Sequence, residues 1–164
     1  MRRHWSMTAV GCCLALFALQ CDPKPSPDTR AADEAAIRAI NPVWFNSYRA
    51  GDVNSIVALY AEDAVVSAPG TPAARGQAAI REFFVKDIAN STAAGVTLNA
   101  GLTTDAGVSG DLGWEWGTFS VTDKAGTTVD TGKYVTVYAR KDGKWLIIRD
   151  IWNSDGPMQA PETR

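Results

Sequence analysis

Apolar residues recur at helical spacing between residues 31 and 50. The stripe that they form contains Ala36, Ile37, Ile40, Val43, Trp44 and Tyr48. Gly51 is expected to end this helix, because glycine readily adopts the left-handed conformation found at helix ends. The pair Asn41-Pro42 lies inside the stripe and predicts a kink, or a restart with Asn41 as the cap.

Two shorter helical patterns follow. Asp52 can cap a helix over Val53–Tyr60, and a third helix is expected from Gln77 to about Ala89, where apolar residues again share one side. Between them, Ala64–Ala68 predicts a short strand that ends in a turn rich in Pro and Gly.

After Asn90 the helical spacing gives way to strand-like runs of β-branched and aromatic residues, separated by Gly, Asp and Ser turns. These runs are Val96–Thr103, Leu112–Thr122, Thr127–Arg140 and Trp145–Asn153. Helices first and strands later predict an α+β fold, in which helices pack on one face of a mostly antiparallel sheet.

The last two runs flank Asp142-Gly143, a strong signal for a tight hairpin. The final run is mostly apolar but contains Asp150, which therefore needs a solvated face, a partner or a cavity. A two-residue loop pairs Asp150 with Val135, whereas a three-residue loop pairs it with Tyr134. We favour the Tyr134 register, because it gives a buried carboxylate a hydrogen-bond donor.

The first residues have the order of a targeting segment. Arg2 and Arg3 precede an apolar run from Met7 to Leu19, which is short for a bilayer span. The stretch that ends at Cys21 resembles a bacterial lipoprotein signal, in which the cysteine becomes the lipidated first residue. The alternative is ordinary secretion, with Cys21 a free thiol.

This pattern divides the chain into a signal peptide over residues 1–20, a lipidated Cys21 with a Pro-rich tether over 21–30, one domain over 31–155 and a flexible tail over 156–164. The expected location is the bacterial cell envelope, lipid-anchored on the periplasmic or outer surface, or else outside the cell after secretion.

Charge and composition exclude several classes of function. The formal net charge is −2, and removal of the first twenty residues takes away two Arg, so no basic patch for nucleic acid emerges. Every Cys and the only His lie within the first twenty-one residues. The domain therefore has no thiol or imidazole for catalysis or metal binding. We expect no metal and no cofactor, and any chemistry falls to carboxylates, Tyr, Lys, Arg or the backbone.

Several short motifs occur in a recognisable order. They are Ala50-Gly51-Asp52, the run Leu59–Val65, Arg75-Gly76 with Ala79–Phe83, and Gly143-Lys144-Trp145. Together they make residues 31–155 resemble the nuclear transport factor 2-like superfamily, which includes ketosteroid isomerases and SnoaL-like cyclases. The resemblance implies a cone: a curved, mostly antiparallel sheet packed on three N-terminal helices, with a pocket between them and a homodimer formed through the sheet.

The same resemblance argues against ketosteroid isomerase activity. The family's general-base Asp aligns near Ala68, which cannot accept a proton, and its oxyanion-hole Tyr aligns with Trp44. The second oxyanion donor falls near Tyr134 or Val135. Without the base, the proton-transfer step of that reaction is lost.

The resemblance also implies which side chains face the pocket. Aligned on Gly143-Lys144, the last strand directs Ile148, Asp150 and Trp152 inward, and strand alternation places these three on one face. The expected pocket residues are Trp44, Tyr48, Trp116, Tyr134, Ile148, Asp150 and Trp152.

Asp150 has two interpretations. In an aromatic pocket, desolvation would raise its pKa and make it an acid or base near neutral pH. Alternatively it is structural, bonded to Tyr, Trp, backbone groups or Arg149.

The tryptophans are open to a similar choice. Aromatic residues suit a flat or apolar ligand, but they also fill cores and dimer interfaces. Trp114 and Trp116 share a face with Leu112 and are assigned to core or interface, whereas Glu115 points oppositely and is expected to be solvated. Glu62-Asp63 lacks a nearby third metal ligand and is interpreted as a cap or a solvated turn.

Three functions fit this sequence. The first is an envelope-anchored domain whose aromatic pocket holds a small apolar molecule, or an accessory domain without a ligand. The second is a cofactor-free isomerase, cyclase or dehydratase that uses Asp150 as its acid or base, with Tyr134 or Tyr48. The third is a purely structural dimer module. The partners expected are therefore a small apolar ligand, a second copy of the chain, and the membrane through the lipid anchor alone.

Overall fold

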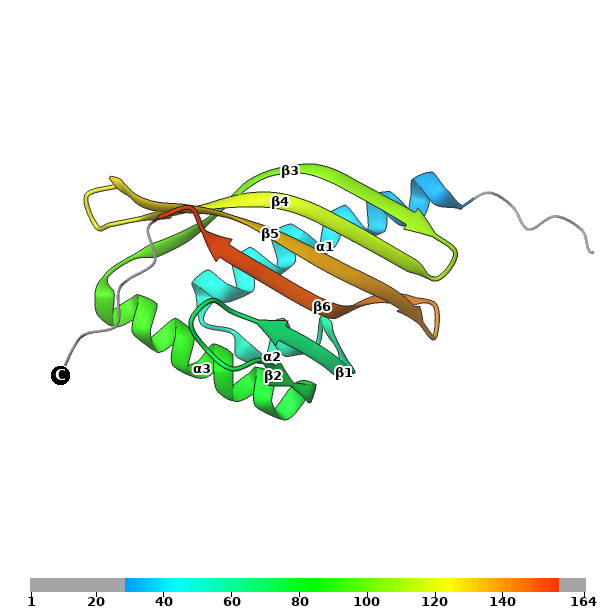
Figure 1. Cartoon of the computed structure of the whole chain (residues 1–164), viewed down its shortest axis with the longest axis horizontal. Coiled ribbons are helices and arrows are strands. Elements are labelled where there is room, and N and C mark those ends of the chain that lie inside the picture. The colour runs from blue at the N-terminus through cyan, green and yellow to red at the C-terminus, as the bar shows by residue number, and fades with distance from the viewer. Residues whose placement is uncertain (1–28, 157–164) are drawn as a thin grey trace, which may run out of the picture.

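A computed structural model describes residues 29–156 as three helices and one sheet (Figure 1). The helices are α1 (Arg30–Ala50), α2 (Val53–Val57) and α3 (Gly76–Ala94). The strands are β1 (Tyr60–Ser67), β2 (Ala74–Arg75), β3 (Thr97–Ser109), β4 (Leu112–Thr122), β5 (Thr128–Lys141) and β6 (Lys144–Ser154). The signal peptide, Cys21, most of the tether and most of the tail that we expected lie outside the described residues.

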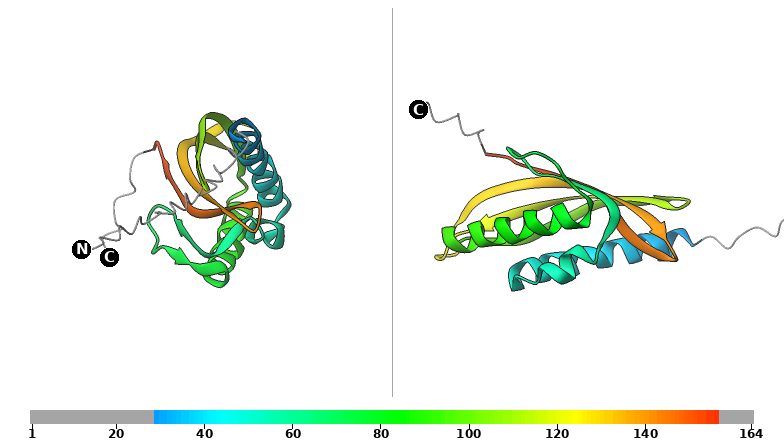
Figure 2. Two further views of the ribbon diagram at one scale, coloured as in Figure 1. Left: turned by 90° about the vertical axis from the view of Figure 1, so that its right-hand side faces the viewer. Right: turned by 90° about the horizontal axis from the view of Figure 1, so that it is seen from below.

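The sheet has six strands in the order β2-β1-β6-β5-β4-β3. Neighbouring strands are antiparallel except β1 and β6, which run parallel. Viewed along the molecule, the sheet curves over α1 and α3, which lie on one side of it (Figure 2). The α+β cone predicted from the sequence is therefore confirmed. None of the described helices is long and apolar enough to cross a membrane.

α1 is one continuous helix through Pro42, so the predicted restart with Asn41 as cap is wrong, whereas the alternative of a kink stays a prediction. Proline removes a single donor from the helical ladder, and packing against β3 and β4 holds the helix together across that position. Asn41 instead directs its side chain inward to the sheet. The end of the helix is as predicted, since Gly51 has a φ of 70° and its N–H bonds to the last carbonyls.

α2 is shorter than predicted, because Tyr60 begins β1 rather than ending the helix. Asp52 caps α2 as expected, with its carboxylate 3.0 Å from the N–H of Ser55. The parallel ladder with β6 accounts for the early start of β1: the N–H of Ile147 donates to the carbonyl of Leu59 at 2.8 Å, and Tyr60 pairs with Ile147. This change turns the Tyr60 side chain into the core.

The core lies where the helices meet the inner face of the sheet. Its largest fully buried apolar side chains are Ile37, Ile56, Tyr60, Val66, Ile80 and Phe84. Asp33, near the start of α1, fastens that helix to β5 and β6: it lies 2.5 Å from the guanidinium of Arg140 and accepts a hydrogen bond from Trp145 at 3.2 Å. These contacts, with Arg140 first, lower the pKa of Asp33 to about 2.

The β5–β6 hairpin has the two-residue loop signalled by Asp142-Gly143, because Lys141 pairs with Lys144 and both loop residues have positive φ. The register at Asp150 is nevertheless neither of the two that we weighed. A bulge between the pairs Tyr138–Ile147 and Val137–Arg149 leaves Ile148 unpaired, so Asp150 lies opposite Thr136.

The bulge has a physical reason in the strand's own pattern. Trp145 and Ile147 occupy odd positions, whereas Asp150 and Trp152 occupy even ones, and an unbroken strand would send the two pairs to opposite faces. One extra residue lets all four face the helices. Ile148 is that extra residue; it is half-buried against the core, and Ile147 rather than Ile148 lines the cavity.

Candidate ligand-binding cavity

A cavity of about 240 Å³ lies between α1, α3 and the inner face of the sheet. Aromatic rings make up much of its wall, namely Trp44, Phe45, Tyr48, Phe84, Phe119, Tyr134, Tyr138 and Trp152. Polar side chains reach it from both helices and from β5 and β6; they are Asn41, Asp87, Ser91, Asp130, Thr136, Asp150 and Ser154. An apolar cavity with a few convergent polar groups is the usual form of a small-molecule site.

Of the seven residues predicted for the pocket, five line the cavity: Trp44, Tyr48, Tyr134, Asp150 and Trp152. Ile148 does not, because of the bulge. Trp116 does not either, because it lies on the outer face of β4 opposite Val135, with 36% of its surface exposed. Whether the five contact a ligand stays a prediction.

Asp150 lies at the buried wall of the cavity and is held by a chain of hydrogen bonds. Tyr60 donates to its Oδ2 at 2.6 Å, and Thr136 donates to Oδ1 at 3.3 Å. The indole N–H of Trp44 donates in turn to the Tyr60 hydroxyl at 3.0 Å. Neither predicted partner, Tyr134 or Tyr48, bonds to Asp150.

Desolvation raises the pKa of Asp150 to about 6, although the hydrogen bonds from Tyr60 and Thr136 oppose the shift. The negative charge of Glu115 adds to the increase. Arg149 does not neutralise the site, because it is exposed and donates to the carbonyl of Ile148. Asp150 therefore titrates close to neutral pH without a cationic partner in the described chain.

Glu115 is completely buried, so the prediction that it is solvated is wrong. Its Oε1 accepts hydrogen bonds from Asn41 at 2.6 Å, Tyr134 at 2.6 Å and Thr103 at 3.1 Å. Its Oε2 has no hydrogen-bond partner among the described residues. Donors from α1, β3 and β5 thus converge on one carboxyl group behind the cavity wall.

A signal for this inward position is present in the sequence. Gly113, Glu115 and Gly117 alternate with Trp114 and Trp116, and glycine on the tryptophan-free face marks a close approach. A Cβ on Gly117 would lie 2.3 Å from the Tyr134 hydroxyl, and one on Gly113 would lie 2.3 Å from a methyl group of Ile37. The space that these glycines leave is filled by the helix and by Tyr134, with Glu115 between them.

Three further polar side chains, Tyr48, Asp87 and Ser91, line the cavity and contact one another. Tyr48 donates to Asp87 Oδ2 at 2.5 Å and lies 3.0 Å from the Ser91 hydroxyl. Burial, followed by the bond to Asp87, raises the pKa of Tyr48 above its usual range.

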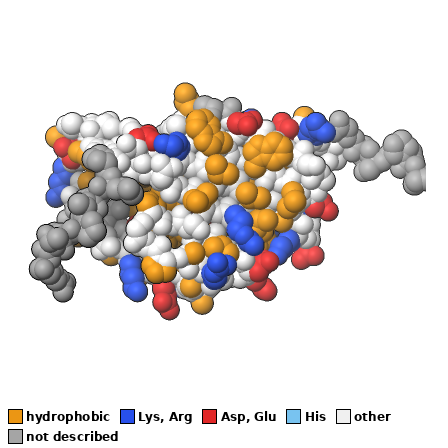
Figure 3. All heavy atoms as spheres, viewed as in Figure 1, with side chains coloured by type: hydrophobic (Ala, Val, Ile, Leu, Met, Phe, Trp, Pro, Cys, Tyr) orange, Lys and Arg blue, Asp and Glu red, His pale blue; other side chains and the backbone are white. Residues whose placement is uncertain are grey.

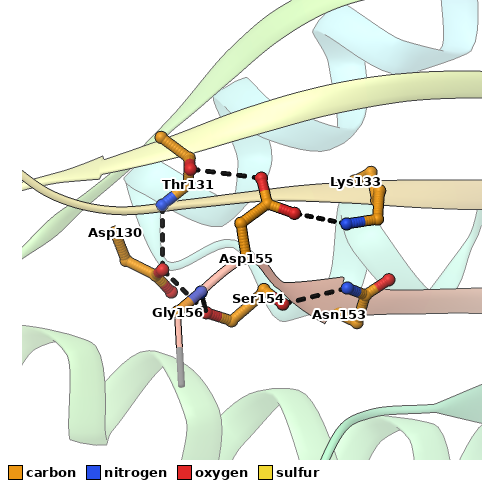
Figure 4. Close-up of polar contacts among 7 residues, drawn as sticks. All are labelled: Asp130, Thr131, Lys133, Asn153, Ser154, Asp155 and Gly156. Carbon is orange, nitrogen blue, oxygen red and sulfur yellow. Dashed lines mark hydrogen bonds and ion pairs between the residues drawn. The ribbon is translucent and has the colours of Figure 1, made fainter. Parts of the chain in front are cut away.

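At the ends of β5 and β6, Asp130 Oδ1 accepts hydrogen bonds from the Thr131 N–H at 2.8 Å and from the Ser154 hydroxyl at 2.7 Å (Figure 4). Lys133 and Thr131 both bond to Asp155 nearby. These contacts fix the end of β6 against the start of β5.

No three His, Cys, Asp or Glu side chains of residues 29–156 cluster in a way that could hold a metal ion. Glu62 and Asp63 are exposed on β1, and Asp63 pairs with Lys141 at 2.7 Å. Ala68, which aligns with the isomerase base, follows β1 and does not line the cavity.

The comparisons with known proteins agree with this architecture. A family model described as a SnoaL-like domain matches residues 43–148. A search among curated proteins found no match.

Several solved structures share the fold. A nuclear transport factor 2-like protein with a cystatin-like fold from Novosphingobium aromaticivorans has 22% identity and a TM-score of 0.69, covering 78% of this chain and 86% of its own. One of unknown function from Pseudomonas putida has 21% identity and a TM-score of 0.70, covering 79% and 91%. A candidate dehydratase of the same family from Streptomyces avermitilis has 17% identity and a TM-score of 0.62, covering 74% and 95%.

We expect Asp150→Asn to stabilise the protein at about pH 8 and to have little effect at about pH 4. A carboxyl with a raised pKa binds its proton more tightly in the folded state, so its contribution to stability falls as pH rises from its ordinary value toward 6. At about pH 8 the free energy of unfolding of Asp150→Asn should therefore exceed that of the native protein by up to about 3 kcal/mol. Urea unfolding of both proteins at the two pH values measures it.

Asp63→Asn is the matched control, because this exposed carboxylate has a lowered pKa and a Lys141 partner. Its removal should not stabilise the protein at either pH. A clear loss of stability for Asp150→Asn at about pH 8 would contradict the account, since it would mean that the ionised form is favoured in the cavity.

Proposed function

This chain belongs to the SnoaL-like domain family, and we propose that its cavity binds a small, largely apolar molecule in a protein held at the cell envelope. The observation that carries the proposal is the aromatic cavity of about 240 Å³ with polar groups converging from α1, α3, β5 and β6. This volume lies just below the range of about 300–1,000 Å³ that holds drug-sized molecules, so the ligand is expected to be small.

The polar groups of the cavity also support binding. Asp150 costs free energy to bury, and a core built only for stability would place an apolar side chain there. Asp87 is half-buried at the same cavity. Polar groups placed at an aromatic cavity favour a role in holding a ligand. The envelope location rests on the charged start, the apolar run and Cys21, all in the sequence alone.

We expect Val121→Trp to abolish binding, because Val121 lines the cavity at the end of β4 and an indole there would fill it. Native mass spectrometry of the full chain, extracted gently from its membranes, should show a small-molecule adduct that this variant lacks. A lipid on Cys21 would appear as added mass in the same spectrum. Val85→Trp is the control, since it adds the same bulk on the exposed side of α3, where 53% of Val85 is accessible. An adduct retained by a folded Val121→Trp variant would place the ligand elsewhere.

A second function is favoured by one observation: Asp150 lines the cavity and has a pKa raised to about 6, a value suited to proton transfer at neutral pH. An isomerase, cyclase or dehydratase reaction needs such a group within reach of the bound molecule. The likeness to a candidate dehydratase adds only a shared fold to this argument.

For an enzyme, we expect Asp150→Asn to bind the co-purified molecule but not to convert it, because the amide keeps an acceptor for Tyr60 and loses the transferable proton. Chromatography with mass spectrometry follows isomerisation, ring closure or loss of water over time. Thr136→Val is the control, since it removes the weaker contact and leaves the carboxyl. An unchanged molecule with the native protein, or equal conversion by Asp150→Asn, would leave binding as the function.

We propose, third, that the chain forms a homodimer through the outer face of the sheet. Hydrophobic side chains gather across this face (Figure 3). They include Leu112, Trp114, Trp116, Val135 and Ile151, all of them substantially exposed. The Trp116, Val135 and Ile151 positions lie side by side on three adjacent strands, which makes a continuous apolar strip.

We expect Trp116→Glu to convert the dimer to a monomer. An unpaired charge buried in an apolar interface costs at least about 2 kcal/mol, which weakens association about 30-fold. Light scattering coupled to gel filtration over a dilution series measures the change. Val85→Glu, at a more exposed apolar site on α3, should leave association unchanged. A native protein that is monomeric at every concentration would contradict the proposal.

A further inference from the structure

The wall of the cavity carries acidic groups and no basic ones. Asp87, Asp130 and Asp150 all line it, and no Lys, Arg or His of residues 29–156 does. The ion pairs of this part of the chain use other carboxylates, at Asp33, Asp63, Asp111 and Asp155. The three cavity aspartates therefore have no ion-pair partner in the described protein.

Two of these carboxyl groups each keep an oxygen that no described donor reaches. Asp87 accepts the Tyr48 hydroxyl with Oδ2 at 2.5 Å, which leaves Oδ1. Asp130 accepts both of its hydrogen bonds with Oδ1, which leaves Oδ2. Each free oxygen can accept a hydrogen bond from a ligand.

Five hydroxyl groups around the cavity donate their hydrogens to carboxylates of the protein. Tyr48 donates to Asp87, Tyr60 to Asp150 and Tyr134 to Glu115. Thr136 and Ser154 likewise donate to Asp150 and Asp130. In the described wall, the donors left for a ligand are the indole N–H of Trp152 and the hydroxyl of Tyr138, because Ser91 donates to Tyr48, whose own hydrogen goes to Asp87. A ligand thus meets mainly acceptor atoms and negative charge.

The aromatic rings of the wall also favour a positively charged ligand. Trp44 stacks on Tyr48 with ring centroids 5.3 Å apart and meets the edge of Phe84 at 5.7 Å. The faces of such rings carry negative electrostatic potential and attract cations, most strongly for Trp. Apolar surface and charge therefore favour the same class of molecule.

We infer that the cavity selects an organic cation: a small amine, protonated at neutral pH, whose apolar part packs on the aromatic rings and whose ammonium group pairs with Asp87 or Asp130. The inference rests on the proposed binding function and specifies its ligand class. An anion is disfavoured because it would bring a further negative charge to carboxyl groups that have no counter-ion.

Three probes of one shape and different charge test this inference. They are 2-phenylethylamine, 2-phenylethanol and phenylacetate, titrated into the full-length protein at neutral pH and followed by calorimetry and by tryptophan fluorescence. We expect the amine to bind at least about tenfold more tightly than the alcohol, and phenylacetate to bind most weakly. Asp87→Asn or Asp130→Asn should reduce the preference for the amine and leave the affinity for the alcohol unchanged.

Asp63→Asn is the matched control, because it removes one negative charge outside the cavity and should preserve the preference. If the alcohol binds as tightly as the amine, or the preference persists in the Asp87→Asn/Asp130→Asn double variant, the inference is overturned while the proposed binding function stands. If none of the three probes binds, the inference is overturned, and the adduct in the native mass spectra decides separately whether the proposed binding function stands.

Discussion

Two carboxyl groups, Asp150 and Glu115, are buried on the inner face of the sheet without a cation beside either of them in the described chain. Burial of an acidic group is costly unless hydrogen bonds satisfy it. The fold supplies those bonds from widely separated segments: Asn41 from α1, Tyr60 from β1, and Tyr134 from β5. The relative placement of helices and strands is thus tied to the hydrogen bonds that these two groups accept.

This constraint also explains the shape of the cavity. Asn41 points toward Glu115, and the helical spacing of α1 places Trp44 and Tyr48 on the same face, where they line the cavity. The bulge at Ile148 brings Asp150 and Trp152 to the face that Trp145 and Ile147 already occupy. Polar groups that a stable core would exclude therefore surround a space bounded by aromatic rings. Such departures from good packing are typical of functional sites.

Much of the fold was predictable from local patterns. Helical spacing located α1 and α3, and Gly51, Asp52 and the Asp142-Gly143 turn marked element boundaries because each position has a local conformational requirement. The pocket was predictable in part, because Trp44 and Trp152 lie on faces that their own elements define.

What the sequence did not reveal depends on tertiary contacts. Tyr60 fitted the end of a helix equally well, and only pairing with β6 places it in a strand that reaches Asp150. β6 contains no Gly or Pro that would indicate the bulge at Ile148. Glu115 was misplaced because two neighbouring tryptophans suggested a buried face, although the flanking glycines, Gly113 and Gly117, carried the better information.

The most direct test of the central claim, that the cavity holds a desolvated carboxyl group, is the pKa of Asp150 measured by carbon-detected NMR of its side chain across a pH titration. The Asp150→Asn variant assigns the signal. We expect a pKa of about 6, because burial raises it against the opposing effect of the bonds from Tyr60 and Thr136. A value at or below the ordinary one of about 4 would contradict it, because the carboxyl group would then be solvated or paired with a cation.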